Sequence, residues 1–183
     1  MCLCGSIFLA CAHPPPAQPS SRAIVDADIR RAEDAELHRR HDLARQGYER
    51  AIADAKEPET QRYARREFAE TLEQWGEIAE AIAQLEAAVA AVPADAASWN
   101  DLGVLYYQQG DTGRALAALE RAKALAPRDW RPRRQLAAVL VATHDYTRAT
   151  AEYRAMLDLE LPDRLRAAVK KALELLAAST PSS

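Results

Sequence analysis

The stretch SWNDLGVLYYQQGDTGRALAALERAKALAP, residues 98–127, contains two amphipathic segments separated by a short turn. In the first segment, Leu102 and Tyr106 are four residues apart and therefore share one face of a helix. Gly103 lies beside Leu102 and lets a second helix approach closely. Ala115 is the small counterpart in the second segment. The stretch therefore predicts two helices packed face to face.

The ends of these two helices carry their own signals. Gly110 supplies a left-handed residue at the end of the first helix, and Asp111 caps the start of the second. Pro127 stops the second helix. Asp95 and Asp129 are placed to cap the first helix of this unit and of the unit that follows. The pattern thus defines a unit with a beginning and an end.

The same pattern recurs every 34 residues. The central unit, residues 96–129, has Trp99, Leu102, Gly103, Tyr106, Gly110, Ala115, Leu119, Ala122 and Pro127. The unit before it, residues 62–95, has Phe68, Ala69, Leu72, Gly76, Ala81, Leu85, Ala88 and Pro93. The unit after it, residues 130–163, has Leu136, Ala137, Leu140, Asp145, Tyr146, Ala149 and Tyr153, with His144 at the turn position. Three units follow one another without a gap.

These units resemble tetratricopeptide repeats. The resemblance implies an all-α, right-handed α-α superhelix, in which each unit buries its apolar stripe against its neighbours. An amphipathic segment from Asp163 to about Ala178 is expected to be a capping helix (residues 164–178), with Val169 and Leu176 on its apolar face. Composition agrees, since alanine, leucine and valine are abundant and aromatic residues make up only 6%.

The segment before the three units, residues 26–61, is expected to be a degenerate repeat, and the alternative is one long helix; Pro58 is expected to end the segment. Tyr48 resembles a residue of a second repeat helix. Asp28 and Arg31, however, occupy places that should be apolar in the first.

The N-terminal residues differ in character from the rest, since no charged side chain precedes Arg22. The run that ends at Cys11 resembles the lipobox of bacterial lipoproteins, in which the cysteine is lipidated. On that hypothesis residues 1–10 are a leader, Cys11 carries the anchor, and residues 11–25 form a proline-rich tether. The expected location is then the periplasmic side of the cell envelope.

Two departures from the lipoprotein pattern leave other readings open. No basic residue precedes the apolar run, and Phe8 and Leu9 stand where that family more often has leucine and then a small residue. The alternatives are a secretory signal cleaved without lipid and a cytoplasmic protein with an apolar N-terminus. All three cysteines lie within the first eleven residues, so the remaining chain is indifferent to the redox compartment.

The resemblance implies that the first helices line a concave groove that holds a segment of a partner protein. The groove residues expected from the repeat register are Tyr63, Arg66, Glu70 and Glu73, then Asn100, Val104, Tyr107 and Gln108, then Arg131, Arg134, Ala138 and Val141. We expect Arg66, Asn100, Arg131 and Arg134 to form a row of donors suited to carboxylates or a peptide backbone. Glu70 and Asp101 stand where some family members have the asparagines that hold a terminal carboxylate, so such a partner is not expected.

The sequence favours binding over catalysis. It contains no glycine-rich phosphate loop, no Gly-flanked serine nucleophile and no recognised zinc-ligand pair. No cofactor or metal is therefore expected, although His38 and His41 lie three residues apart. The net charge of −3 is not that of a nucleic-acid-binding protein. It hides an asymmetry, because residues 22–121 carry 13 basic and 20 acidic side chains, and residues 122–183 carry 11 and 7.

Overall fold

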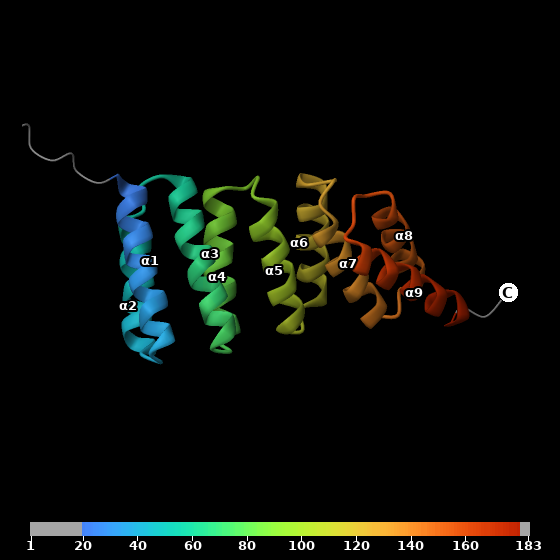
Figure 1. Ribbon diagram of the computed structural model, residues 1–183, viewed down its shortest axis with the longest axis horizontal. Coiled ribbons are helices and arrows are strands. Elements are labelled where there is room, and N and C mark those ends of the chain that lie inside the picture. Colours follow the sequence, from blue (N-terminus) through green and yellow to red (C-terminus); the bar gives the residue numbers. More distant parts are fainter. Residues whose placement is uncertain (1–19, 180–183) are drawn as a thin grey trace, which may run out of the picture.

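The computed structural model describes residues 20–179, and within them the chain forms nine α-helices and no strand. The helices are α1 (Ser21–Leu37), α2 (His41–Asp54), α3 (Pro58–Gln74), α4 (Ile78–Ala91), α5 (Ala96–Gln108), α6 (Thr112–Leu125), α7 (Trp130–Ala142), α8 (Tyr146–Leu157) and α9 (Asp163–Ser179). Figure 1 shows them stacked along one long axis, from α1 and α2 at one end to α9 at the other. The expected all-α class is confirmed.

The helices pack in consecutive pairs. Each first helix (α1, α3, α5 and α7) packs on the second helix that follows it, and each second helix packs on the next first helix. Neighbouring first helices also touch, α1 with α3 and α5 with α7. Helix α9 packs on α8 and closes the C-terminal end. This is the expected helix-pair solenoid with its capping helix.

The turn signals read from the sequence are confirmed. Gly110 has a φ of 90°, and the Asp111 carboxylate accepts from the backbone N–H of Arg114 at 3.0 Å. His144 takes the same left-handed position, with a φ of 63°. Asp129 caps α7 by accepting from the backbone N–H of Arg131 at 2.9 Å, and Asp95, Asp111 and Asp145 cap their helices in the same manner.

The close approach inside the central pair is also confirmed. A Cβ placed on Gly103 would lie 2.6 Å from Cγ of Leu119 and 3.2 Å from the backbone oxygen of Ala115. Leu102 and Tyr106 are buried on either side of this contact. Trp99 is only partly buried, and its indole N–H donates to the Pro93 carbonyl at 3.1 Å. It therefore lies at the edge of the core rather than within it.

The N-terminal segment is a repeat-like pair and differs from the expectation in two respects. The helices α1 and α2 form a fourth pair and not the alternative single long helix, with Arg39 in the left-handed conformation at the turn (φ 56°). Pro58 does not end this segment but opens α3, since a proline at the first helical positions has no N–H to leave unpaired. Helix α1 begins at Ser21, within the stretch expected to be tether, and is capped by the Ser20 hydroxyl.

A change in spacing explains why the first pair looks degenerate in the sequence. The left-handed residues Gly76, Gly110 and His144 are 34 residues apart, whereas Arg39 lies 37 residues before Gly76. Helix α3 has 17 residues, against 13 in α5 and 13 in α7, so it carries about one additional turn at its start. Aligned on Arg39, the first pair is a complete unit.

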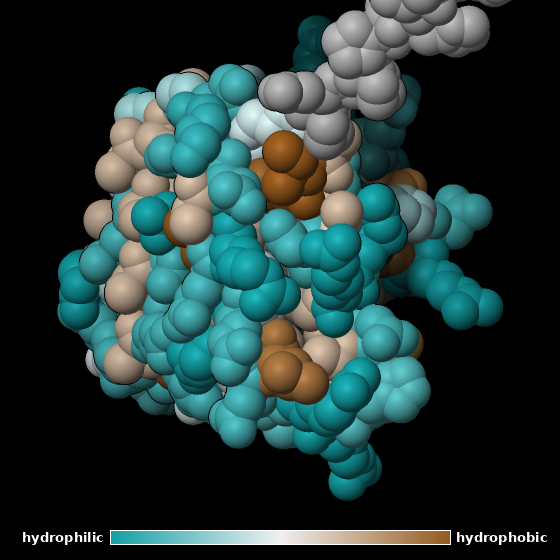
Figure 2. Space-filling model, turned by 90° about the vertical axis from the view of Figure 1, so that its left-hand side faces the viewer, coloured by the Kyte–Doolittle hydropathy of each residue, from teal (hydrophilic) through white to brown (hydrophobic). Residues whose placement is uncertain are grey.

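The two polar residues of α1 that seemed out of place have different roles. Asp28 is buried, and its carboxylate accepts from Arg31 at 2.9 Å and lies 3.6 Å from Nε of Arg50. Arg31 occupies the position of Leu102 in the central unit, but α1 is the first helix of the described residues, and the Arg31 side chain is 70% exposed. Figure 2 looks onto this end of the stack and shows a mostly hydrophilic surface with a few separate apolar patches.

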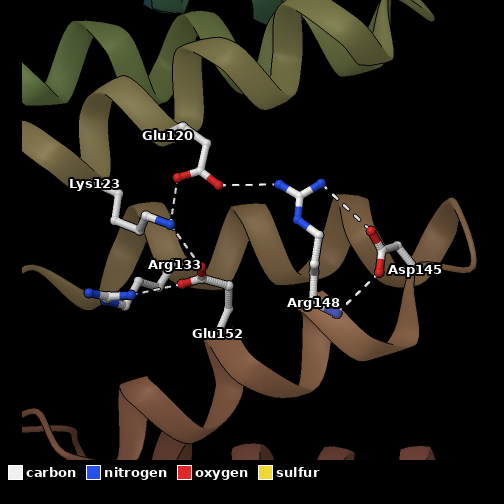
Figure 3. Close-up of polar contacts among 6 residues, drawn as sticks. All are labelled: Glu120, Lys123, Arg133, Asp145, Arg148 and Glu152. Atoms are coloured by element: carbon white, nitrogen blue, oxygen red, sulfur yellow. Dashed lines mark hydrogen bonds and ion pairs between the residues drawn. The ribbon is translucent and has the colours of Figure 1, made fainter.

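The C-terminal pair is tied to α6 by a network of charged side chains (Figure 3). Lys123 of α6 contacts Glu120 at 2.5 Å and Glu152 of α8 at 2.8 Å. Arg133 of α7 contacts the other oxygen of Glu152 at 2.8 Å. Arg148 bridges Glu120 and Asp145 at 3.3 and 3.6 Å. The network therefore joins three successive helices.

Candidate protein-binding groove

The surface formed by α1, α3, α5 and α7, called the groove here, contains two adjacent hollows. The first lies between α3 and α5 and has a volume of about 280 Å³. Its lining residues are Arg66, Ala69, Glu70, Glu73, Leu85, Asp101 and Leu105. Arg66, Glu70 and Glu73 were expected from the sequence to face a groove, and the structure brings them together around this hollow.

Two of the four donors expected to form a row, Arg66 and Asn100, are engaged within the chain. Nε of Arg66 donates to Asp101 Oδ2 at 2.7 Å, and the amide of Asn100 donates to Oδ1 of the same carboxylate at 3.2 Å. The amide of Gln108 donates to Glu73 at 2.7 Å. Asp101 therefore ties Arg66 of α3 to α5 and also accepts from its neighbour Asn100 on the same helix.

The second hollow, between α1 and α3, was missed by the sequence analysis. Its volume is about 290 Å³, and its lining residues are Glu33, Glu36, Leu37, Tyr48, Glu67, Glu70, Thr71 and Gln74. Tyr48 of α2 is buried beneath it, and Thr71 donates a hydrogen bond to its hydroxyl at 2.9 Å. The signal that reveals α1 as a groove helix is the left-handed Arg39, which sets the repeat register of the first pair.

Carboxylates dominate this second hollow, called the acidic hollow below. Burial raises the pKa of Glu67 above its ordinary value, and the nearby negative charges of Glu70 and Glu33 raise it further, while Arg66 opposes the shift. Glu36 is partly satisfied, since the indole N–H of Trp75 donates to its Oε2 at 2.8 Å. A cationic ligand would relieve the repulsion among these groups.

The N-terminal edge of the groove includes Tyr63, which the repeat register placed among the groove residues. The guanidinium of Arg22 covers its ring at 3.7 Å from the centroid, and Nε of Arg22 also pairs with Asp26 at 2.9 Å. Burial raises the pKa of the Tyr63 hydroxyl. This side chain is therefore part of the wall rather than an open contact.

The middle of the groove, on α5, is the least charged part. Tyr107 is 38% exposed and is among the few large apolar side chains that reach the solvent in the described residues. Val104, one helical turn before it, is partly buried. A side chain with a flat apolar face and a polar tip is suited to anchoring an interface.

The C-terminal part of the groove, on α7, carries two arginines around one indole. The guanidinium carbons of Arg131 and Arg134 lie 5.3 and 5.2 Å from the Trp130 ring centroid. Both side chains are exposed, and Trp130 itself packs against the apolar core formed by α8 and α9. Ala138 is exposed further along α7, and Val141 packs against the C-terminal core.

The remaining expectations concern metals and membranes. No group of three or more His, Cys, Asp or Glu within residues 20–179 is arranged to hold a metal ion. His38 contacts the Asp34 carbonyl at 2.7 Å, whereas His41 packs its ring edge against Trp75. None of the helices in the described chain is both long and apolar enough to span a bilayer. Cys11 and the leader lie outside the described residues.

Comparisons with known proteins agree with this architecture. The tetratricopeptide-repeat family model matches residues 66–129. The MamA protein structure has a TM-score of 0.63 and 20% identity, covering 74% of this chain and 73% of that chain. The pilF protein of Pseudomonas aeruginosa has a TM-score of 0.64 and 18% identity, covering 85% and 72%.

A thermophilic tetratricopeptide-repeat protein of Thermus thermophilus has a TM-score of 0.59 and 23% identity, covering 85% of this chain and 82% of that one. At these identities the similarity is one of fold. The sequence has no significant match among curated proteins.

Proposed function

Because the chain is a tetratricopeptide-repeat protein, we propose that it is a non-catalytic scaffold whose groove binds a segment of a partner protein. The observation that carries this proposal is the exposed Tyr107, which lies in the middle of the groove between an acidic end and a basic end. An exposed aromatic flanked by charged rims is the usual composition of a protein interface.

The charged groups of the groove fit binding better than catalysis. Arg66 and Asp101 pair with each other across two helices. The three histidines of the described chain lie at turns or helix ends: His38, His41 and His144. A general acid or base must reach a reacting group in the same site. Within residues 20–179, Nδ1 of His41 lies 3.4 Å from Oε1 of Glu36 in the acidic hollow, but its ring packs against Trp75, and no cysteine or serine is among the residues that line either hollow.

A photocrosslinking experiment tests the groove. Replacing Tyr107 with p-benzoylphenylalanine is expected to crosslink a partner protein in cells. Adding Val104→Glu is expected to abolish the crosslinked product, because the substitution places a charge at a partly buried position beside Tyr107. The matched control places the same crosslinker at Glu49, which is exposed on α2. Identical products from both positions would show that Tyr107 does not mark a specific site.

The membrane anchor is the second part of the proposal. We infer that Cys11 is lipidated and that the chain works on the periplasmic side of the envelope, where it helps to assemble a pilus, secretion or wall-synthesis complex. Support comes from the lipobox-like run before Cys11 and, for the process, from analogy between folds. The alternative is a cytoplasmic adaptor that uses the same groove without lipid.

Metabolic labelling with a fatty-acid analogue separates these two alternatives. The wild-type chain is expected to take up label and sediment with membranes, and Cys11→Ser is expected to lose both properties. Cys4→Ser is the matched control, because it removes a cysteine from the same segment and leaves the lipobox-like run intact. Equal labelling of wild type and Cys11→Ser would favour the adaptor.

A further inference from the structure

Three of the four glutamates that line the acidic hollow have no direct cationic partner. Among the described residues, no Lys, Arg or His forms an ion pair with Glu33, Glu67 or Glu70, whereas Glu36 lies 3.4 Å from Nδ1 of His41. The arginines whose charges act on Glu67 are engaged elsewhere, Arg22 with Asp26 and Arg66 with Asp101. The three carboxylates therefore face one hollow with their charge only partly compensated.

The pKa of one of the three carboxylates reflects this repulsion. Burial, then the charge of Glu70, holds the pKa of Glu67 above its ordinary value, and Glu33 acts in the same direction. A protein that keeps unpaired carboxylates together at a concave surface gains complementarity to a positively charged ligand. A lysine or arginine side chain has the reach and the charge to enter such a hollow.

The opposite end of the groove has the opposite charge. Arg134 has no carboxylate partner among the described residues, and Arg131 pairs only with Asp129, the cap of its own helix, at 3.3 Å. Arg134 is 34 residues after Asn100 and 68 after Arg66, so all three occupy the same place in successive first helices. Arg66 lines the first hollow, which shares Glu70 with the acidic hollow, so the acidic hollow and the α7 arginines lie on the same side of the stack.

The distance between the two ends sets the length of a ligand. Three steps between neighbouring first helices, at about 9 Å each, give a span of about 27 Å. An extended chain covers that span with about eight residues. Tyr107 lies between the two charged ends and is exposed enough to contact the middle of such a segment.

Building on the proposed function, we propose that the groove selects an extended partner segment of about eight residues with opposite charges at its two ends. Lysine or arginine at one end occupies the acidic hollow, and aspartate or glutamate at the other end binds Arg131 and Arg134. An apolar residue between them packs on Tyr107. The groove thereby fixes both the composition of the segment and its direction across the helices.

Selection from a random nine-residue peptide library displayed on phage, with the full chain as target, tests this proposal. The expected peptides carry basic residues at one end and acidic residues at the other. A synthetic peptide from the selection is then measured by fluorescence anisotropy. Glu33→Lys with Glu70→Lys is expected to weaken its binding about tenfold or more, because like charges then oppose each other.

Matched variants separate charge recognition from damage to the fold. Glu49→Lys with Glu160→Lys makes the same change in net charge at two exposed positions outside the groove, and binding is expected to stay within about twofold of wild type. Arg131→Glu with Arg134→Glu is expected to select a different population, with basic residues at both ends of the peptide. A reversed preference cannot arise from misfolding, and unchanged circular dichroism is the accompanying check.

The possible failures are distinguishable. One outcome is that the selected peptides compete with one another and lose binding in Val104→Glu, but show no charge bias. That outcome would overturn the proposed preference for opposite end charges and would still support a binding scaffold. Peptides that bind equally well to wild type and to Val104→Glu would place recognition outside the groove and overturn both proposals. No selected peptide at all would also count against both.

Discussion

The first helix pair and the central pair share one contact and differ in what lies beside it. In α5 and α6, Gly103 meets Leu119 and Ala115, and in α1 and α2, Gly47 meets Ala32, where an added Cβ would lie 2.8 Å from the Ala32 Cβ. The small residue has moved to the other helix of the pair, yet the close approach is the same. The equivalent positions that face the neighbouring pair differ: Leu102 is buried, and Arg31 is exposed.

The comparison separates two kinds of constraint on a repeat. Packing within a pair needs small residues somewhere along the contact, whichever helix supplies them. Packing between pairs needs an apolar residue only where another pair exists to cover it. The terminal pair of a solenoid instead needs a polar outer surface to stay soluble. The polar residues of α1 are therefore the signature of an end, and Asp28 remains buried because two arginines surround it.

The largest expected change in the free energy of unfolding comes from replacing Leu102 with alanine, compared with the equivalent residue Arg31. Leu102→Ala removes a side chain buried between two pairs and is expected to lower the free energy of unfolding by about 2–5 kcal/mol. Arg31→Ala removes an exposed side chain, leaves Arg50 near Asp28, and should cost less than about 1 kcal/mol. Urea denaturation measures both. Similar losses would mean that the first pair is covered in solution.

The shared contact is tested by filling its small positions. Alanine for glycine inside a helix normally gains about 1 kcal/mol, but overpacking is expected to reverse the sign and cost about 1–3 kcal/mol in Gly103→Ala and in Gly47→Ala. Gly113→Ala is the control, because its Cβ would meet only an Asp111 oxygen at 3.7 Å. A stabilised Gly47→Ala would show that the first pair is more loosely packed than the central one.

Substitutions at two of the turns are expected to change the free energy of unfolding by smaller amounts and in opposite directions. Arg39 is a non-glycine residue at a φ of 56°, so Arg39→Gly should raise stability by up to about 1 kcal/mol. Gly76→Ala, at a φ of 80° with nothing within 4 Å of the added Cβ, should lower it by about the same amount. Thermal unfolding of the two variants compares them directly. Equal signs would indicate that Arg39 is held by contacts other than the turn itself.

The smallest expected effect tests the electrostatics of the groove. The pKa of Glu67 is raised above 4.5, so the folded protein binds this proton more tightly than the unfolded chain does. The ionised carboxylate therefore costs stability at pH 7, and the cost disappears as the pH falls through the raised pKa. Glu67→Gln should gain a few tenths of a kcal/mol at pH 7 and nothing near pH 4. Glu49→Gln, on the exposed surface of α2, is the matched control for the loss of one negative charge.

Much of the fold follows from residues that act locally. The caps and turns at Asp95, Gly110 and Asp129 depend on neighbours within four positions, so the sequence contains all that is needed to place them. The additional turn at the start of α3 is different. It shifts the first pair out of the 34-residue register, and a search at fixed spacing then compares the wrong residues. The left-handed Arg39 is not recognisable as a turn residue from its type.

The groove was predictable in outline but not in its charges. The repeat register places Arg66 and Arg134 on one surface. It does not show that Arg66 forms an ion pair with Asp101, which is 35 residues after it. The acidic hollow depends on Glu33 and Glu67 from neighbouring pairs, and the irregular spacing between those pairs hid their proximity. Pairing between side chains of adjacent repeats is a tertiary property, whereas the surface on which they lie is periodic.

The ion-pair network around Lys123 lies at the boundary between two apolar cores. The apolar core of the first three pairs ends at Ala118, and the next residue, Leu119, belongs to a separate core shared with α7 to α9. Part of the joint between these two cores is ionic, through Lys123, Arg133 and Glu152. Water solvates those charges when the joint opens, so opening exposes less apolar surface than a wholly hydrophobic joint would. We expect α7 to α9 to exchange their amide hydrogens as one cooperative unit, ahead of α1 to α6.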